Sequence, residues 1–414
     1  PRYARSTAKS MACIAAGAAT VTGVPGDALA AFGPYPHGYG MKSLGMGGIG
    51  YTAAEDSYPV SANPAQAGSV GARADVGMDW VMVRAGAAIH DNLLGPDQTY
   101  APQAGLTLPL SGRSWLGISA FAAGLGTDYQ DSPYARFGGD EVAQATIGQS
   151  GISTALAYEL SPKHLLGVSL NLSYQLLDIG GLGALALFSE DPQHVTDQGI
   201  DGAFGAGYSI GWIGELGDGV QVGAAYRSKQ WSRRFDKYAG LLPDRGRFEL
   251  PAQYGVGVSW RLSANWILAT EVQRQLFSRE RATGNGIEQL YEGERLGSRN
   301  GPGFGWNDLT IFRFGLGWQA SRDWLLRAGF ATCTQPLAGS ETLLNALGPN
   351  TMRRHYTLGF TYDFAERWEV TGYGVYAPSE TVQGRDSLPL LLGDGEIDAT
   401  NGQHSFGFSI GYRF

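Results

Sequence analysis

The C-terminal stretch Ser405-Phe406-Gly407-Phe408-Ser409-Ile410-Gly411-Tyr412-Arg413-Phe414 alternates between two kinds of side chain without interruption. Every second residue is a bulky aromatic or aliphatic side chain, and the residues between them are Ser, Gly or Arg. Successive side chains of a β-strand point to opposite faces of the sheet. A period of two therefore predicts a strand with one bulky face and one small face.

The same alternation returns throughout the chain. Clear copies lie at 312–318, 324–330 and 356–364, and fainter copies at 166–174, 204–212, 220–226, 254–260 and 266–272. In a soluble sandwich the bulky residues face inward and charged side chains cover the outside. Here the second face is mostly Gly, Ser, Thr and Ala, which suits the crowded interior of a closed sheet whose bulky face meets lipid. Closure also pairs every backbone polar group, as lipid requires.

The composition excludes several classes of protein. Glycine makes up 62 of 414 residues, about twice the usual share, and charged residues only 16%. The formal net charge is -8 and no basic cluster is present, so the chain is not expected to bind nucleic acid. No stretch approaches the ~20 consecutive apolar residues of a membrane-spanning helix.

The links between the alternating segments also alternate, in length. Short links lie at 111–114, 161–163, 217–219, 263–265, 321–323 and 365–367, and long ones at 89–98, 126–149, 180–201, 231–247, 278–308, 335–354 and 378–403. Six short and seven long links join fourteen strands, an even number with short periplasmic turns and long outer loops. Four strands begin with Trp directly after a short turn, the position of an interfacial girdle: Trp115, Trp266, Trp324 and Trp368. The sequence therefore predicts an all-β fold, a 14-stranded antiparallel transmembrane β-barrel of the bacterial outer membrane.

The N-terminal part predicts export. A basic leader, a small and apolar run at 11–24 and the small-x-small pattern Ala28-Leu29-Ala30 predict that residues 1–30 are a cleaved signal peptide. The alternative is a helical leader on a cytosolic protein. We expect residues 31–71 to form an N-terminal hatch that plugs the lumen, and residues 72–414 to form the barrel.

Residues 31–71 do not alternate and are rich in glycine. The stretch 45–50 formally fits the dinucleotide-binding fingerprint, but no strand pattern precedes it and the chain has no βαβ rhythm. We expect glycine here to allow tight turns and close backbone contact in a confined space.

The same N-terminal stretch resembles part of a known family. The segment Gly38–Ala65 contains Gly-Tyr-Gly, Lys-Ser-Leu-Gly-Met-Gly-Gly, Asp-Ser and Asn-Pro-Ala, and it is similar to the N-terminal hatch of the FadL/TodX outer-membrane transporters of hydrophobic compounds. Further similar stretches follow in order at 126–129 with 135–139, at 306–308, at 326–330 and at 354–359. The resemblance covers the whole mature chain.

The resemblance implies passive uptake of a hydrophobic molecule, with a long-chain fatty acid as the first candidate and an aromatic hydrocarbon as the alternative. The ligand would pass from a loop groove to a lumen pocket above the hatch. After a hatch rearrangement it would leave sideways, at a kink in the third strand, into the membrane. No enzyme activity, cofactor or metal is implied. The expected partners are the ligand, outer-membrane lipid and lipopolysaccharide, and the barrel-assembly machinery through Phe414.

The resemblance and the inner face together give candidate site residues. The hatch or gating candidates are Lys42, Gly45, Met46, Gly47, Gly48, Asn63, Pro64 and Ala65. The ligand-binding candidates are Arg136, Arg227, Arg313 and Arg327, which could pair with a carboxylate. The alternatives stay open: Asn-Pro-Ala as a simple turn, Arg136 as a solvated loop residue, and the other three as partners of Glu159, Glu271 and Asp363. The apolar loop runs 182–188 and 388–392 suggest a ligand groove.

Three rival functions remain. A diffusion porin would need an open lumen, and residues 31–71 are long enough to plug it. An outer-membrane hydrolase would need a nucleophile elbow, but Gly-x-Ser-x-Gly occurs only at 207–211 and 407–411, inside alternating strands. A structural barrel or adhesin would bind no apolar ligand.

Overall fold

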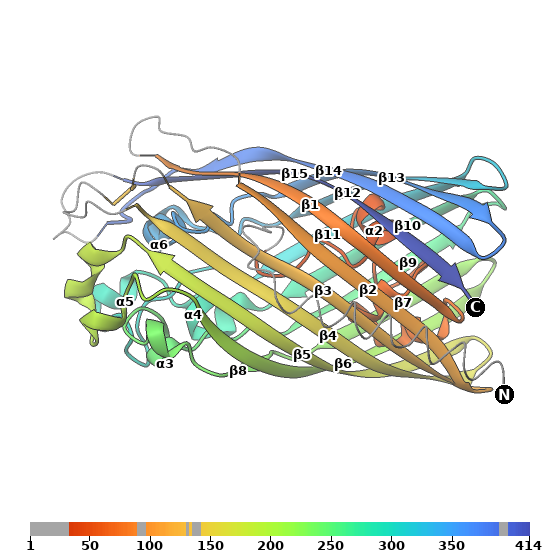
Figure 1. Cartoon of the computed structure of the whole chain (residues 1–414), viewed down its shortest axis with the longest axis horizontal. Coiled ribbons are helices and arrows are strands. Elements are labelled where there is room, and N and C mark those ends of the chain that lie inside the picture. Colours follow the sequence, from red (N-terminus) through yellow and green to blue (C-terminus); the bar gives the residue numbers. More distant parts are fainter. Residues whose placement is uncertain (1–32, 89–96, 130–131, 135–141, 389–395) are drawn as a thin grey trace.

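The structure, a computed structural model, describes residues 33–88, 97–129, 132–134, 142–388 and 396–414. The predicted signal peptide lies outside these residues. Within them, fourteen long strands form one antiparallel sheet that closes on itself (Figure 1). They are β1 (Arg73–Ala88), β2 (Asp97–Ser111), β3 (Ser114–Asp128), β4 (Gln144–Ser161), β5 (His164–Gly180), β6 (Asp201–Gly217), β7 (Val220–Arg227), β9 (Gln253–Arg261), β10 (Trp266–Gln275), β11 (Leu309–Gln319), β12 (Trp324–Cys333), β13 (Arg354–Ala365), β14 (Trp368–Val382) and β15 (Asp398–Arg413).

The barrel closes where its first and last strands meet. β1 pairs with β15 along its whole length, from Arg73↔Arg413 to Ala88↔Asp398. A short extra strand, β8 (Trp231–Ser232), adds to the outer end of β6. The predicted 14-stranded barrel is thus confirmed. Among the described residues, no helix is long and apolar enough to cross a membrane.

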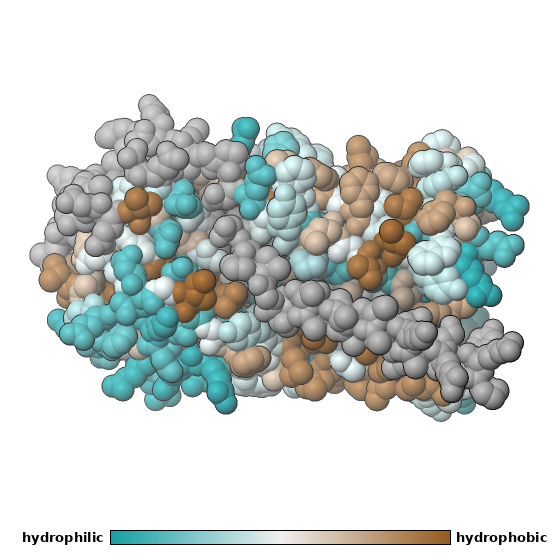
Figure 2. Space-filling model, viewed as in Figure 1, coloured by the Kyte–Doolittle hydropathy of each residue, from teal (hydrophilic) through white to brown (hydrophobic). Residues whose placement is uncertain are grey.

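The two faces of the strands match the alternation in the sequence. On β15, Phe408 and Ile410 are more than half exposed, whereas Ser405 and Ser409 are buried. Apolar side chains cover the wall of the barrel in Figure 2. At the end with the short turns, aromatic rings of neighbouring strands are in contact: Trp266–Trp318 and Trp324–Tyr362 are stacked, and Trp368–Tyr412 is tilted. This is the interfacial girdle that the repeated Trp predicted.

The six predicted short turns connect successive strands as expected, but several strands are longer at their outer ends. β4 begins at Gln144 and β15 at Asp398, earlier than the alternation indicated. Beyond the lipid belt the outer face no longer has to be apolar, so the pairing continues after the pattern has faded.

The hatch segment, defined by the described residues 33–71, contains short helices: α2 (Met41–Gly45), η1 (Tyr58–Ser61) and η2 (Pro64–Gly68). Figure 1 shows it inside the barrel, in red and orange. Proline stands in the first turn of both η helices, where its missing N–H has no helical partner to lose. Asn63 caps η2 by accepting a hydrogen bond from the Ala65 N–H at 3.1 Å.

The outer loops fold into an apolar core of their own at the other end of the barrel. They carry η4 (Gly183–Phe188), η5 (Pro192–His194), η6 (Asp236–Tyr238), α3 (Pro243–Gly246), η7 (Phe277–Arg279), α4 (Arg281–Gly284), α5 (Glu288–Tyr291), η8 (Gly339–Glu341) and α6 (Thr342–Asn345). Aromatic residues of these loops, such as Tyr134, Tyr238 and Trp306, are buried in one cluster with Tyr35 of the hatch segment. Leu182 and Leu185 of the predicted groove belong to this core, whereas Leu187 is 81% exposed. Residues 389–392 lie outside the described residues.

Candidate functional site

A buried ion cluster attaches the hatch segment to the barrel wall. Lys42 lies 2.5 Å from Glu369 of β14, and Arg73 of β1 lies 2.6 Å from the same carboxylate. Arg73 also pairs with Asp75, which accepts hydrogen bonds from both the N–H and the hydroxyl of Ser57. These groups are almost fully buried, so each charge depends on its partners.

A second attachment is made by Glu271, which projects from β10 into the lumen. Its carboxylate accepts hydrogen bonds from three successive hatch N–H groups: Gly50 at 3.0 Å, Tyr51 at 2.6 Å and Thr52 at 3.2 Å. Successive backbone N–H groups of this kind form a concave anion site. Here the anion is a side chain of the barrel, and the backbone N–H groups that bind it belong to the hatch.

We expect Glu271→Ala to loosen this part of the hatch without unfolding the barrel. Hydrogen bonds to a charged group contribute about 1.5–3 kcal/mol, so amide exchange at residues 50–52 should accelerate about 10- to 100-fold. Hydrogen exchange read by mass spectrometry measures this, with Glu215→Ala, at the periplasmic end of β6, as the matched carboxylate control. Unchanged exchange at these three amides would contradict the assignment.

The predicted glycine-rich core of the hatch packs against the wall of β11–β13. Gly45 faces Gly359, and the Gly47 N–H donates to Thr357 Oγ1 at 2.9 Å. Gly48 has φ +84°, and a Cβ there would lie 2.4 Å from the His37 carbonyl oxygen, so only glycine fits. Met46 packs with Ile49 against Ala269.

The Asn-Pro-Ala motif lies against β5 and β6. Asn63 Nδ2 donates to the carbonyl oxygens of Tyr51 at 3.0 Å and Trp212 at 3.2 Å. A Cβ on Gly211 would lie 1.9 Å from Asn63 Oδ1, and one on Gly167 would lie 2.3 Å from the Ala65 nitrogen. Val60 and Ala67, on either side of this motif, pack against Gly117 of the third strand, β3. The motif is therefore more than a turn, because its side chain joins two parts of the hatch to the wall.

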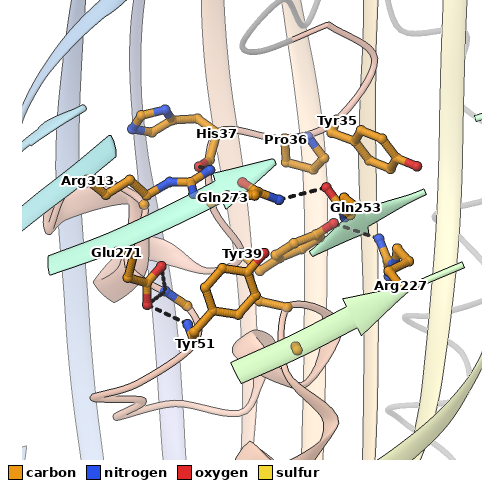
Figure 3. Close-up of a pocket in the computed structure, with 15 residues that line it drawn as sticks. Tyr35, Pro36, His37, Tyr39, Tyr51, Arg227, Gln253, Glu271, Gln273 and Arg313 are labelled. Atoms are coloured by element: carbon orange, nitrogen blue, oxygen red, sulfur yellow. Dashed lines mark hydrogen bonds between the residues drawn. The ribbon is translucent and has the colours of Figure 1, made fainter. Parts of the chain in front are cut away.

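A small pocket lies between two stretches of the hatch segment, 35–39 and 48–51, and the wall of β7, β9, β10 and β11 (Figure 3). Its polar lining includes Arg227, Arg313, Gln253, Gln273 and the ring of Tyr39. The free space is about 20 Å³, enough for a water molecule and no more. A larger ligand needs a movement of the hatch stretch 35–39.

Arg227 is the residue of this pocket whose charge is least compensated. It is 3% exposed and forms no ion pair with a carboxylate among the described residues. Its guanidinium donates to the Tyr39 hydroxyl at 2.9 Å (Figure 3). It also donates, more weakly, to Ser153 and Asn171. A buried ionic group with only neutral partners is costly, and such groups mark ligand paths in membrane proteins.

The other predicted arginines separate in space. Arg313 lines the same pocket, opposite Glu271 across the β10–β11 ladder, and donates to the His37 carbonyl oxygen at 3.3 Å. Arg327 lies elsewhere, paired with Glu55 and donating to Thr361 at 2.8 Å. Arg136 lies outside the described residues. The structure thus brings two of the four together.

His37 is buried in the same pocket and stacks on His355 with ring centroids 4.5 Å apart. Burial, together with the nearby His355 and Arg313, lowers the pKa of His37 well below its usual value. The His37 ring is therefore neutral at neutral pH, and it leaves the positive charge of the pocket to the arginines.

A second pocket, of about 40 Å³, lies on the other side of the stretch 36–38. Its walls carry apolar side chains such as Leu44 and Val81, and also Asp79, Gln103 and Ala123. Neither Asp79 nor Gln103 was predicted as a site residue. Their positions on β1 and β2 give them inward-facing side chains, but no motif distinguishes them from other polar residues of the inner face.

The wall beside this second pocket is split. β2 and β3 pair from Ser111↔Ser114 only as far as Ala104↔Ala120. Beyond this point, residues 97–103 pair with β1, and residues 121–128 pair with β4. Phe121, the first β3 residue past the split, points inward and meets Tyr39 edge-on at 5.0 Å.

The chain matches a known protein family. The family model described as Outer membrane protein transport protein (OMPP1/FadL/TodX) matches residues 52–414. The chain belongs to this family. Members of the OMPP1/FadL/TodX family are outer-membrane transport proteins, so the predicted outer-membrane location is confirmed. No curated protein sequence matches the chain.

Solved structures share the fold of this OMPP1/FadL/TodX member. The toluene transporter TodX of Pseudomonas putida is 18% identical, with a TM-score of 0.69 over 91% of this chain and 99% of that one. A FadL homologue of Pseudomonas aeruginosa is 15% identical, with a TM-score of 0.70 over 93% and 100%. The toluene transporter TbuX of Ralstonia pickettii is 18% identical, with a TM-score of 0.64 over 91% and 99%.

Proposed function

We propose that this protein takes up long-chain fatty acids, and that Arg227 receives their carboxylate. The observation that carries the proposal is the buried guanidinium of Arg227, which has neutral hydrogen-bond partners. A carboxylate is the natural counter-ion for a guanidinium and can accept two parallel hydrogen bonds. Arg313, in the same pocket, adds a second positive charge.

The hatch stretch 35–39 is the moving part in this proposal. It contributes Tyr35, His37 and Tyr39 to the first pocket, and residues 36–38 also line the second. A displacement of this stretch would therefore enlarge the first pocket and join it to the second. A carboxylate that replaced the Tyr39 hydroxyl at Arg227 would remove one of the contacts that hold the stretch.

The exit in this proposal is the split between β2 and β3. The second pocket is bordered by Gln103 of β2 and by Ala122 and Ala123 of β3, which flank the end of the pairing. An acyl chain gains about 0.8 kcal/mol for each CH₂ group that leaves water, so its overall transfer from the external water into the bilayer needs no energy source.

Aromatic hydrocarbons are the second candidate ligands, and Asp79 favours them. Its carboxyl group lines the second pocket, so a carboxylate ligand would pass close to another acidic group before the exit. A neutral hydrocarbon would bring no second acidic group there. TodX and TbuX, whose fold is shared, are described as toluene transporters.

Uptake of radiolabelled oleate and toluene distinguishes the two candidates. The full chain would be expressed in a Gram-negative host that lacks its own fatty-acid transporter, with an empty-vector strain as control. We expect oleate uptake to rise severalfold and toluene uptake to change little. A rise for toluene alone would replace the first candidate by the second, and large steady conductance in planar bilayers would favour a porin over both.

A further inference from the structure

A group of arginines projects from the outer loops at the edge of the lipid belt. This outer arginine cluster consists of Arg233, Arg234, Arg245 and Arg247. Arg233 and Arg234 directly follow β8, and the other two flank the end of α3. Hydrophilic residues gather at this end of the molecule in Figure 2, beyond the apolar wall.

The backbone holds the cluster in a fixed arrangement. The two stretches pair at Arg234↔Arg247, and the Phe235 N–H donates to the Gly246 carbonyl oxygen at 2.7 Å. The Arg233 N–H donates to the Phe204 carbonyl oxygen of β6 at 2.9 Å, which fixes the cluster to the barrel. Asp244 and Arg245 both adopt left-handed backbone angles, with φ 53° and 57°. Such strain in residues other than glycine persists where the surroundings impose it, and it is concentrated at functional sites.

The cluster carries an excess of positive charge. Asp244 lies 2.9 Å from Arg234 and 2.8 Å from Arg247, so a single carboxylate serves two guanidinium groups. Glu249 is shared in the same way between Arg247 and Lys229. Arg233 and Arg245 are exposed and form no ion pair with a carboxylate among the described residues.

The position of the cluster along the membrane normal decides which anionic groups it can contact. Trp231 is half exposed and stacks on Tyr208 of β6, with ring centroids 6.3 Å apart, as expected of an aromatic belt at the headgroup level. Ser232 is buried, so Arg233 points outward on the same face as Trp231, one step further from the membrane centre. From this aromatic pair we infer that the cluster lies near the level of the headgroup phosphates of the outer leaflet.

We propose that the outer arginine cluster binds the phosphate groups of lipopolysaccharide in the outer leaflet. Guanidinium groups bind phosphate through paired hydrogen bonds, and basic residues just beyond the apolar belt attract anionic headgroups. This surface is separate from the lumen pockets, so the proposal does not depend on which ligand the protein transports.

Binding of purified lipid A to the full chain in detergent tests the proposal, with native mass spectrometry as the readout. We expect bisphosphorylated lipid A to bind more tightly than chemically dephosphorylated lipid A. The variant R233Q/R234Q/R245Q should lower the affinity for the bisphosphorylated lipid by at least about tenfold. It keeps Arg247 to pair with Asp244 and Glu249.

The matched control is R113Q/R261Q/R322Q, which removes the same charge from exposed positions at the opposite end of the barrel. It should bind the lipid like the parent chain, and both variants should keep the parent far-UV circular dichroism and thermal unfolding. Equal binding of the dephosphorylated lipid, or an equal loss in the control, would overturn the proposal. Displacement of the lipid by an equal concentration of inorganic phosphate would show a site for free anions and overturn it as well.

Discussion

Arg227→Met is expected to lower the affinity for oleate about 10- to 100-fold, because a hydrogen bond to a charged group contributes about 1.5–3 kcal/mol. Methionine keeps the apolar stem of the side chain and removes the guanidinium. Because the lost interaction is with the carboxylate, the affinity for a neutral ligand such as toluene should change little. Titration of the purified protein with a fluorescent fatty acid, and with unlabelled competitors, measures both affinities.

Arg227→Lys should retain part of the affinity for oleate, since it keeps the positive charge but cannot form paired hydrogen bonds. The control is Arg261→Met, at the exposed periplasmic end of β9. If oleate and toluene lost affinity equally in Arg227→Met, the effect would be on the shape of the pocket, and the carboxylate assignment would be wrong.

Ala123→Trp is expected to block the exit of the ligand after it has bound at Arg227. Ala123 borders the second pocket, whose free space of about 40 Å³ cannot take an indole ring. An indole ring there would obstruct the route beside the split between β2 and β3, so oleate uptake should fall at least about fivefold, the equivalent of about 1 kcal/mol. Uptake by cells and binding by the purified protein are measured on the same variant.

Binding at Arg227 should survive in Ala123→Trp, because the two pockets lie on opposite sides of the stretch 36–38. Leu156→Trp is the control, since Leu156 is exposed on the lipid-facing side of β4. Undiminished uptake in Ala123→Trp would mean that the ligand leaves elsewhere, and the split between β2 and β3 would lose its role.

The barrel could be predicted from the sequence because the pattern that specifies each strand lies within that strand. Each lipid-facing strand must alternate, so Phe408, Ile410 and the Trp residues after the short turns carry the information one strand at a time. The lengths of the outer loops added the strand number. The outer ends of β4 and β15 were predicted too short, since no lipid constrains their side chains there.

The site was predicted less completely because its partners are distant in sequence. Arg227 and Arg313 were identified from the inner face, but nothing local shows that Arg327 is compensated by Glu55, 272 residues away. Glu271 was considered only as a balancing charge, and its cradle of three hatch N–H groups depends on a turn that the sequence does not encode as a pattern. Apart from its inward-facing position in the alternation of β1, nothing in the sequence distinguishes Asp79.

The ion cluster around Glu369 also sets an order of assembly. Lys42 comes from the hatch segment, Arg73 from the first strand, Glu369 from the penultimate strand, and Arg413 of the last strand contacts Glu369 as well. Lys42 meets the Glu369 carboxylate, and Glu369 meets Arg73, only when the two ends of the polypeptide have come together. We therefore expect the plug to settle at this place after the seam has formed, so that its docking follows completion of the cylinder during biogenesis.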